Sequence, residues 1–311
     1  MLPTMQRAVN LSDNQLSNIP DEIFRQSNLE ELWLDNNLIS GIPSAIIQLS
    51  KLKRLSLYKN SLETLPESLY AMTSLEKLNV SANRLRSLAT ALGNLKNLLV
   101  LDVQHNGLTS IPATIGELTN LSFLYLGGNK LEALPQSLAR LSKLTYLNIT
   151  HNNFALVPDC TEGFDSLIEL RMYNNKITSM PQFIGKLKRL RECYAMDNRI
   201  LSLPESIGQL TNLRKLMLGN NQLERLPDGI GNLTSLTELD LRNNLLIELP
   251  ESIGNMKSLR FLDLRDNKLT VLPEGIRNLP SLEKLDVRLN KGLVLPNWFE
   301  ELEQRGCTVF Y

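Results

Sequence analysis

The chain has 311 residues, and its 33 lysines and arginines balance 33 aspartates and glutamates, so its formal net charge is zero. This balance argues against nucleic-acid binding, which usually needs a strongly basic surface, and no run of about 18 apolar residues is available to cross a membrane. The three cysteines, at positions 160, 193 and 307, are odd in number and widely spaced. This pattern favours a reducing compartment over a disulfide framework. The first residues, MLPTMQRAVNLSDNQ, do not resemble a secretory signal, because no basic region precedes an apolar one.

A unit of 23 residues repeats along the chain. From residue 6 to residue 304 the unit then occurs thirteen times without insertion or deletion. Each unit carries an asparagine at the same place, the ladder asparagine, at positions 14, 37, 60, 83, 106, 129, 152, 175, 198, 221, 244, 267 and 290. The unbroken period leaves no boundary for a second domain, so we predict a single domain over residues 1–311.

The residues of one unit predict its elements in order. Leu216 and Leu218 lie five and three residues before Asn221 and alternate inward on a short strand. Asn221 follows in an inward turn, where its amide can both donate and accept hydrogen bonds. Pro227, six residues later, fixes φ, and the Ile-Gly-x-Leu pattern behind it suits a helical turn. A proline stands at this place in every unit except one, where Ala89 replaces it. Since one unit cannot bury its own leucines, the units must stack, with strands about 4.8 Å apart in a parallel sheet.

Two segments inside the chain depart from the unit. In PDCTEGFDSL, residues 158–167, Thr161 replaces the usual Ile or Leu, and we expect a local loop or bulge instead of a regular helical turn. In RECYAMDNRI, residues 191–200, Cys193 and Ala195 replace the two inward leucines. That loss of core volume costs about 2–3 kcal/mol if the gap is not refilled.

The two ends of the chain also differ from the unit. Gln6 replaces the first leucine, so either the first coil is ragged or a preceding segment is missing. Residues 297–311 predict a C-terminal cap. In this cap a helix covers 297–305, Gly306 ends it, and CTVFY forms a last edge strand.

The unit LxxLxLxxNxLxxLPxxIGxLxx resembles the leucine-rich repeat. The stretch LPESIGQLTNL at 203–213 resembles its 23-residue class, which occurs in intracellular Ras-group and Scribble-type proteins and in many bacterial proteins, including secreted effectors. The resemblance covers nearly the whole chain. It implies an α/β fold, a curved right-handed solenoid with a parallel sheet on the concave face and short helical turns on the convex face. Family analogy further suggests small GTPases, phosphatases or kinases as partners.

The sequence offers no constellation for catalysis. His105 and His151 lie in the same column two repeats apart, about 10 Å, which is too far for one zinc ion and predicts surface turn residues. Cys193 is predicted to face the core and Cys160 to lie in an outer loop, so neither histidine has an adjacent cysteine nucleophile. We therefore predict that the chain is not an enzyme and holds no metal or cofactor.

Large side chains gather at outward strand positions in the middle of the chain. They lie two, four or six residues before a ladder asparagine. Tyrosine, methionine and arginine are favoured in interface cores, although aromatic side chains also pack well along a sheet without a partner. We predict that the following central set binds a protein: Phe123, Tyr125, Tyr146, Arg171, Tyr173, Tyr194, Met196 and Met217.

A charged zone lies nearer the C-terminus. Opposite charges on adjacent strands can pair there, which predicts a self-neutralising ladder that keeps the face soluble; a charged partner could also exchange with it. The zone consists of Asp240, Asp263 and Asp286, four residues before a ladder asparagine, and Arg242, Arg265 and Arg288, two residues before one.

These observations predict a scaffold or adaptor of intracellular signalling that holds another protein on the concave face of the solenoid, in the cytoplasm. The first alternative is the recognition domain of a larger protein or of a secreted bacterial effector that is delivered into a host cytoplasm. The second alternative is a hydrolase or metal enzyme, for which the residues are lacking.

Overall fold

The computed structural model describes residues 6–311; residues 1–5, which the predicted domain includes, lie outside the described residues. The chain divides into two compact units. Of the described residues, 6–152 and 158–164 belong to the first unit, and 153–157 and 165–311 belong to the second. That the thirteen repeats act as a single domain stays a prediction.

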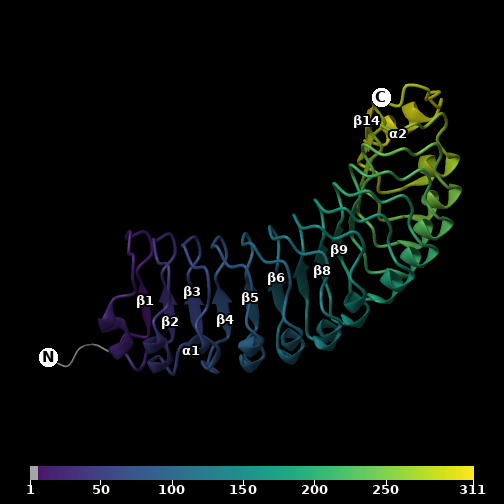
Figure 1. The fold of residues 1–311 in the computed structure, drawn as a ribbon. Coiled ribbons are helices and arrows are strands. Elements are labelled where there is room, and N and C mark those ends of the chain that lie inside the picture. Colours follow the sequence, from purple (N-terminus) through teal and green to yellow (C-terminus); the bar gives the residue numbers. More distant parts are fainter. Residues whose placement is uncertain (1–5) are drawn as a thin grey trace. The chain divides into compact units, whose positions relative to one another are not determined.

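Each repeat contributes a strand of three residues, and within each unit neighbouring strands run parallel (Figure 1). Pairing between the strands of the repeats joins residues 23 positions apart, as in Leu216 with Leu239, so the unbroken period sets the register; the cap strand β14 (Thr308–Phe310) pairs at a separation of 24. The strands of the first unit are β1 (Ala8–Asn10), β2 (Glu31–Trp33), β3 (Arg54–Ser56), β4 (Lys77–Asn79), β5 (Val100–Asp102), β6 (Phe123–Tyr125) and β7 (Tyr146–Asn148). Those of the second unit are β8 (Glu169–Arg171), β9 (Glu192–Tyr194), β10 (Lys215–Met217), β11 (Glu238–Asp240), β12 (Phe261–Asp263), β13 (Lys284–Asp286) and β14 (Thr308–Phe310).

The predicted helical turns are mostly single turns of 3-10 helix. Each begins after a residue in extended conformation, which is a proline in every repeat but the one with Ala89. In the first unit they are η1 (Asp21–Arg25), η2 (Ser44–Gln48), the short α-helix α1 (Glu67–Tyr70), η3 (Thr90–Asn94), η4 (Ala113–Glu117), η5 (Gln136–Arg140) and η6 (Asp159–Gly163). In the second unit they are η7 (Gln182–Lys186), η8 (Glu205–Gln209), η9 (Asp228–Asn232), η10 (Glu251–Asn255) and η11 (Glu274–Asn278).

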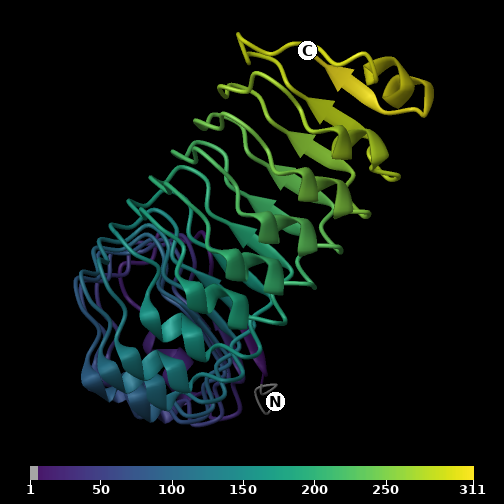
Figure 2. The same cartoon turned by 90° about the vertical axis from the view of Figure 1, so that its right-hand side faces the viewer.

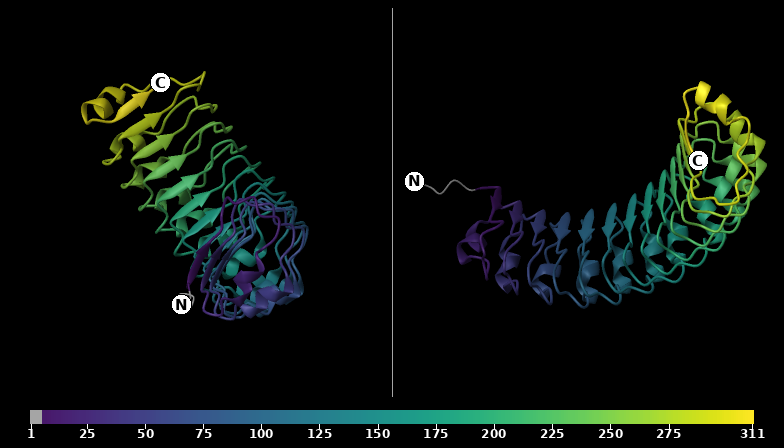
Figure 3. Two further views of the ribbon diagram at one scale, coloured as in Figure 1. Left: turned by 90° about the vertical axis from the view of Figure 1, so that its left-hand side faces the viewer. Right: turned by 90° about the horizontal axis from the view of Figure 1, so that it is seen from above.

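Strands and helical turns lie on opposite sides of each unit. Figure 2 shows this for the second unit, in green to yellow, and Figure 3 shows it for the first, in purple to blue. Between the two layers, Leu216 and Leu218 are fully buried, as are their equivalents in nearly all other repeats; in the first repeat Leu11 is half-buried. The predicted solenoid, with a parallel sheet on one face and short helical turns on the other, is confirmed. We call the face that the strands line the strand face.

The ladder asparagines satisfy the backbone of the turns, as predicted. Asn221 Nδ2 donates to the carbonyl oxygens of Ala195 and Leu218, both at 2.9 Å, and its Oδ1 accepts the Ile200 N–H at 2.9 Å. One side chain therefore links two successive repeats. Because these backbone groups are shut off from water by the turn, the asparagine replaces the solvent that would otherwise bind them.

The expected loop or bulge at residues 158–167 is wrong. This segment contains η6, which begins after Pro158 (φ −60°) and has the same length as its neighbours. The proline and two backbone hydrogen bonds, Thr161 N–H to Pro158 O at 3.0 Å and Phe164 N–H to Thr161 O at 3.2 Å, set the turn. Thr161 is fully buried in the place of the usual isoleucine, and its Oγ1 has no hydrogen-bond partner among the described residues. Cys160 is likewise buried in η6 and does not lie in an exposed loop.

The C-terminal segment covers the last repeat. Helix α2 (Phe299–Gln304) is shorter than the expected 297–305, and Trp298, Phe299 and Leu302 are buried. Gly306 adopts a positive φ of 89°, which glycine tolerates, and the chain then enters β14, which pairs with β13.

The irregular stretch 191–200 keeps the fold. Strand β9 holds its register with β8 and β10, and Cys193 and Ala195 face the core as the leucines do elsewhere. The substitutions therefore change the volume of the inward side chains and leave the backbone of the repeat intact.

Candidate functional site

The first cluster of predicted residues lies on β6 and β7 in the first unit. The Tyr125 and Tyr146 rings are tilted against each other with centroids 4.7 Å apart, and the Phe123 ring lies 6.2 Å from Tyr146. Phe123 and Tyr146 are direct partners across the two strands, which explains the contact. Phe123 is 39% exposed, and both tyrosines are half-buried. The three rings thus form one aromatic surface, which is typical of interface cores.

The second cluster lies on β8, β9 and β10 in the second unit. Arg171, Tyr194 and Met217 stand opposite one another in the sheet. The Arg171 guanidinium carbon is 4.9 Å from the centroid of the Tyr194 ring, a cation–π contact. Tyr173 and Met196 follow their strands and are half-buried, like the other three.

Two glutamates hold the polar groups of the second cluster. Arg171 Nε donates to Glu169 Oε1 at 2.5 Å, and the Tyr194 hydroxyl donates to Glu192 Oε2 at 2.6 Å. Burial raises the pKa of Tyr194, and the hydrogen bond to Glu192 raises it further because it favours the protonated phenol. Tyr194 therefore remains a neutral donor at physiological pH.

The eight predicted residues accordingly form two clusters, three residues on the first unit and five on the second. The role of each cluster in binding stays a prediction.

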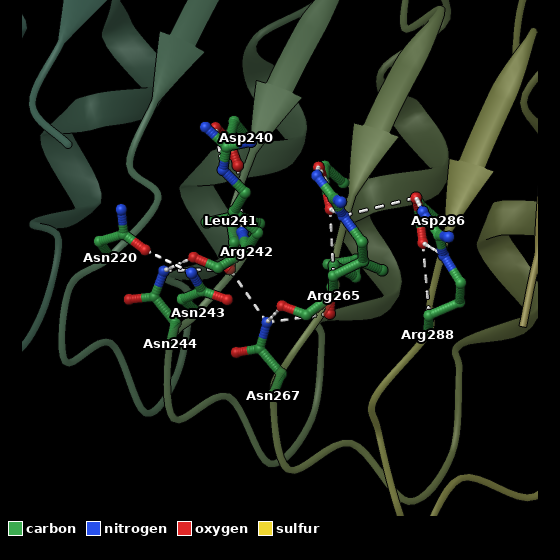
Figure 4. A network of polar contacts seen from close by, with 12 residues as sticks. Asn220, Asp240, Leu241, Arg242, Asn243, Asn244, Arg265, Asn267, Asp286 and Arg288 are labelled. Atoms are coloured by element: carbon green, nitrogen blue, oxygen red, sulfur yellow. Dashed lines mark hydrogen bonds and ion pairs between the residues drawn. The ribbon is translucent and has the colours of Figure 1, made fainter. Parts of the chain in front are cut away.

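The charged zone of the second unit is a network of ion pairs (Figure 4). Arg265 reaches both oxygens of Asp263, with Nη2–Oδ2 at 2.6 Å, and Arg288 holds Asp286 in the same way, also at 2.6 Å. The predicted pairing between adjacent strands is found in one place, where Arg265 Nε lies 3.4 Å from Asp286 Oδ2. The main pairs instead join residues two apart in the chain, because each arginine leaves the strand and folds back over its own aspartate.

The carboxylates of this network are buried under the arginines. The side chain of Asp286 is fully buried and that of Arg288 is 45% exposed. Burial tends to raise the pKa of Asp286, but hydrogen bonds from Arg288 outweigh it and hold the pKa below its ordinary value. Asp240 has a weaker partner, Arg242 at 3.3 Å, and burial raises its pKa. The zone is therefore largely neutralised within the chain.

A groove of about 300 Å³ lies on the strand face of the first unit and was not predicted from the sequence. Trp33 and Tyr125 stand at its two ends, and Ser56, Asn79 and Asp102 lie between them. All five occupy the same column, four residues before a ladder asparagine. The signal that could have revealed it is the order of sizes in this column: large, three small residues, large.

Catalytic chemistry finds no support in the described part of the chain. His105 and His151 are exposed turn residues with φ of 50° and 51°, as predicted. No group of three or more His, Cys, Asp or Glu suited to a metal ion occurs within residues 6–311. Burial raises the pKa of the Cys160 and Cys193 thiols to about 12, which keeps them protonated and poorly nucleophilic. None of the described helices has the length and apolar character needed to cross a bilayer.

Sequence comparison connects the repeat to known proteins. The family model described as a leucine-rich repeat region matches residues 5–110 and 162–246. Two further leucine-rich-repeat models match residues 96–154 and 258–279. A search of curated proteins found no matching sequence.

Solved structures of similar fold include bacterial and plant proteins. A leucine-rich-repeat protein of Leptospira interrogans is 35% identical, with 96% of this chain and 76% of that chain covered and a TM-score of 0.90. The ectodomain of the plant membrane receptor kinase GASSHO1/SCHENGEN3 from Arabidopsis thaliana, solved in complex with CASPARIAN STRIP INTEGRITY FACTOR 2, is 28% identical, with 98% and 41% covered and a TM-score of 0.75. An internalin (inlF) from Listeria monocytogenes is 25% identical, with 89% and 85% covered and a TM-score of 0.68.

Proposed function

The chain belongs to the leucine-rich-repeat family, and from this membership we propose that it is a non-enzymatic scaffold or adaptor that binds another protein on its strand face. The fold serves protein interaction in general, and the GASSHO1/SCHENGEN3 ectodomain, whose structure contains CASPARIAN STRIP INTEGRITY FACTOR 2, is an example of a similar solenoid with a partner. We place its role in cytoplasmic signalling, because the three cysteines of the chain are unpaired and a reducing compartment suits free thiols.

The aromatic surface of the first unit is the observation that carries the proposal. Phe123, Tyr125 and Tyr146 present three rings at the strand face, where the sheet needs no side chain for its own core. Exposed apolar clusters usually have a purpose in soluble proteins. On the second unit, Tyr173, Tyr194 and Met217 supply the same residue types beside Arg171. We propose both clusters as contact surfaces.

Affinity capture with quantitative mass spectrometry tests this proposal. The wild type is compared with the triple variant Tyr125→Ala, Tyr173→Ala and Tyr194→Ala, and circular dichroism verifies that the variant is folded. We expect the triple variant to lose the captured partners. The charged zone provides a control, since Arg288→Ala should leave capture unchanged. If a folded triple variant recovers the same partners in the same amounts, the clusters are not the contact surface.

A further inference from the structure

Two adjacent cations lie on one side of the groove in the first unit. Arg54 on β3 and Lys77 on β4 are direct register partners, so two like charges face each other across neighbouring strands. Such a pair is destabilising on a sheet unless something neutralises it. Arg54 Nη1 lies 3.6 Å from Glu31, and both side chains are partly exposed, which makes this ion pair loose. Lys77 forms no ion pair with any residue in the described range 6–311.

Most other cations on the strand faces have a partner within the chain; Lys284 on β13, for example, lies over the Phe310 ring, with Nζ 5.1 Å from its centroid. Lys215 lies 3.1 Å from Glu238 on the adjacent strand. The arginines of the charged zone each hold an aspartate of their own, as with Arg265 and Asp263 at 2.6 Å. Within residues 6–311, Arg54 and Lys77 therefore form a cationic site that only the loose contact with Glu31 offsets.

The same row of the sheet turns apolar towards the other end of the groove. After Arg54 and Lys77 it continues with Val100 on β5 and Phe123 on β6. Val100 is half-buried and Phe123 is 39% exposed, so both are within reach of a ligand. Tyr125 closes the groove beside them.

The floor of the groove offers hydrogen bonds to a peptide backbone. Asn79 Oδ1 accepts from the Ser81 N–H at 2.9 Å and from the Ser81 hydroxyl at 2.6 Å. The Asn79 amide NH2 donates no hydrogen bond to another described residue and lines the groove. Trp33 and Tyr125 lie four strands apart, which is about 19 Å, the length of about six extended residues.

We propose that this groove binds an extended polypeptide segment with acidic residues at one end and a bulky apolar residue at the other, a proposal that rests on the protein-binding function above. The carboxylates lie on Arg54 and Lys77, and the apolar side chain packs on Val100 and Phe123 beside Tyr125. Asp102, which lines the groove on β5, repels a carboxylate there. The segment therefore binds in one direction only, with its acidic end over β3 and β4.

Peptide display tests the proposal without knowledge of the natural partner. The probe is a random library of eight-residue peptides, selected on the intact protein at low salt, and enriched peptides are measured by fluorescence polarisation. We expect enriched peptides to carry two or more acidic residues followed or preceded, in one constant order, by a bulky apolar residue. Their affinity should fall at least tenfold with Arg54→Glu and Lys77→Glu combined, and it should weaken as salt rises.

A matched variant distinguishes binding at the groove from a general effect of the protein's charge. Arg84→Glu combined with Lys130→Glu makes the same charge change at exposed positions of the first unit that do not line the groove, and it should leave the affinity within twofold of wild type. The proposal is overturned if no peptide is enriched, if the enriched peptides lack acidic residues, or if both double variants weaken binding equally. A double variant, Tyr173→Ala with Tyr194→Ala, leaves the groove residue Tyr125 intact. If the peptide test fails while this double variant still loses the captured partners, the groove is refuted and the scaffold function stands.

Discussion

Replacing a central ladder asparagine should destabilise the protein much more than replacing the first one. In Asn221→Ala, the Ile200 N–H loses its acceptor at 2.9 Å, and the carbonyl oxygens of Ala195 and Leu218 each lose a donor. Asn221 is 7% exposed, so water cannot readily replace the amide. A buried N–H left without a partner costs about 1–3 kcal/mol, and with the weakened carbonyls we expect a total loss of about 2–4 kcal/mol.

Asn14 provides the matched control. It is exposed, and its side chain donates to Ser12 O at 2.8 Å. Water can take over this bond, so Asn14→Ala should change the free energy of unfolding by less than about 0.5 kcal/mol.

Urea unfolding followed by circular dichroism measures both free energies. Amide hydrogen exchange adds a local readout. The Ile200 amide should exchange faster than in wild type in Asn221→Ala, and its exchange rate should be unchanged in Asn14→Ala. Equal losses of stability in the two variants, or an unchanged Ile200 amide in Asn221→Ala, would refute the reasoning that the ladder amide replaces solvent.

Three further predictions concern charge, thiols and the outer turns. Asp286→Asn should lower stability by about 2–3 kcal/mol at pH 7, because charged hydrogen bonds to a buried group are lost. Since the folded-state pKa of Asp286 is lowered, its stabilising contribution is present above the ordinary pKa of an aspartate and disappears as pH falls through the folded value; acid titration of stability should therefore be flatter in the variant. Cys160 and Cys193 should not react with a thiol reagent at pH 8 in the folded state and should react after unfolding in urea, as a thiol count by absorbance will show. Gly116→Ala should lower the thermal midpoint by several degrees, because the new Cβ meets a backbone oxygen of the next turn at 2.2 Å, whereas Gly41→Ala, with nothing within 4 Å, should leave it nearly unchanged.

The fold could be predicted because every strand, turn and ladder asparagine depends on residues inside one 23-residue unit. Residues 158–167 were mispredicted for the same reason: Pro158 and backbone hydrogen bonds set the helical turn, and Thr161 only fills the isoleucine position. The binding surfaces were harder to predict, because the groove depends on the absence of large side chains from neighbouring units. The groove exists where three small residues follow one another between Trp33 and Tyr125, and a search for large side chains passes over it.

The parallel register that makes the fold regular also decides which charges remain available to a partner. It places equivalent residues of successive repeats opposite each other, so like charges meet whenever two successive repeats have residues of the same charge at the same position. Glu169 and Glu192 meet in this way in the second unit, where Arg171 neutralises Glu169 and the Tyr194 hydroxyl donates a hydrogen bond to Glu192.

In the first unit Arg54 meets Lys77, and only a loose contact to Glu31 at 3.6 Å offsets the repulsion. In the second cluster, by comparison, Arg171 and Tyr194 already bind Glu169 and Glu192, so a ligand there gains chiefly from apolar contact with the tyrosine and methionine side chains. A carboxylate that binds to Arg54 and Lys77, by contrast, also relieves a repulsion present in the free protein. For this reason we expect charge to govern recognition at the groove of the first unit and packing to govern it at the cluster on the second.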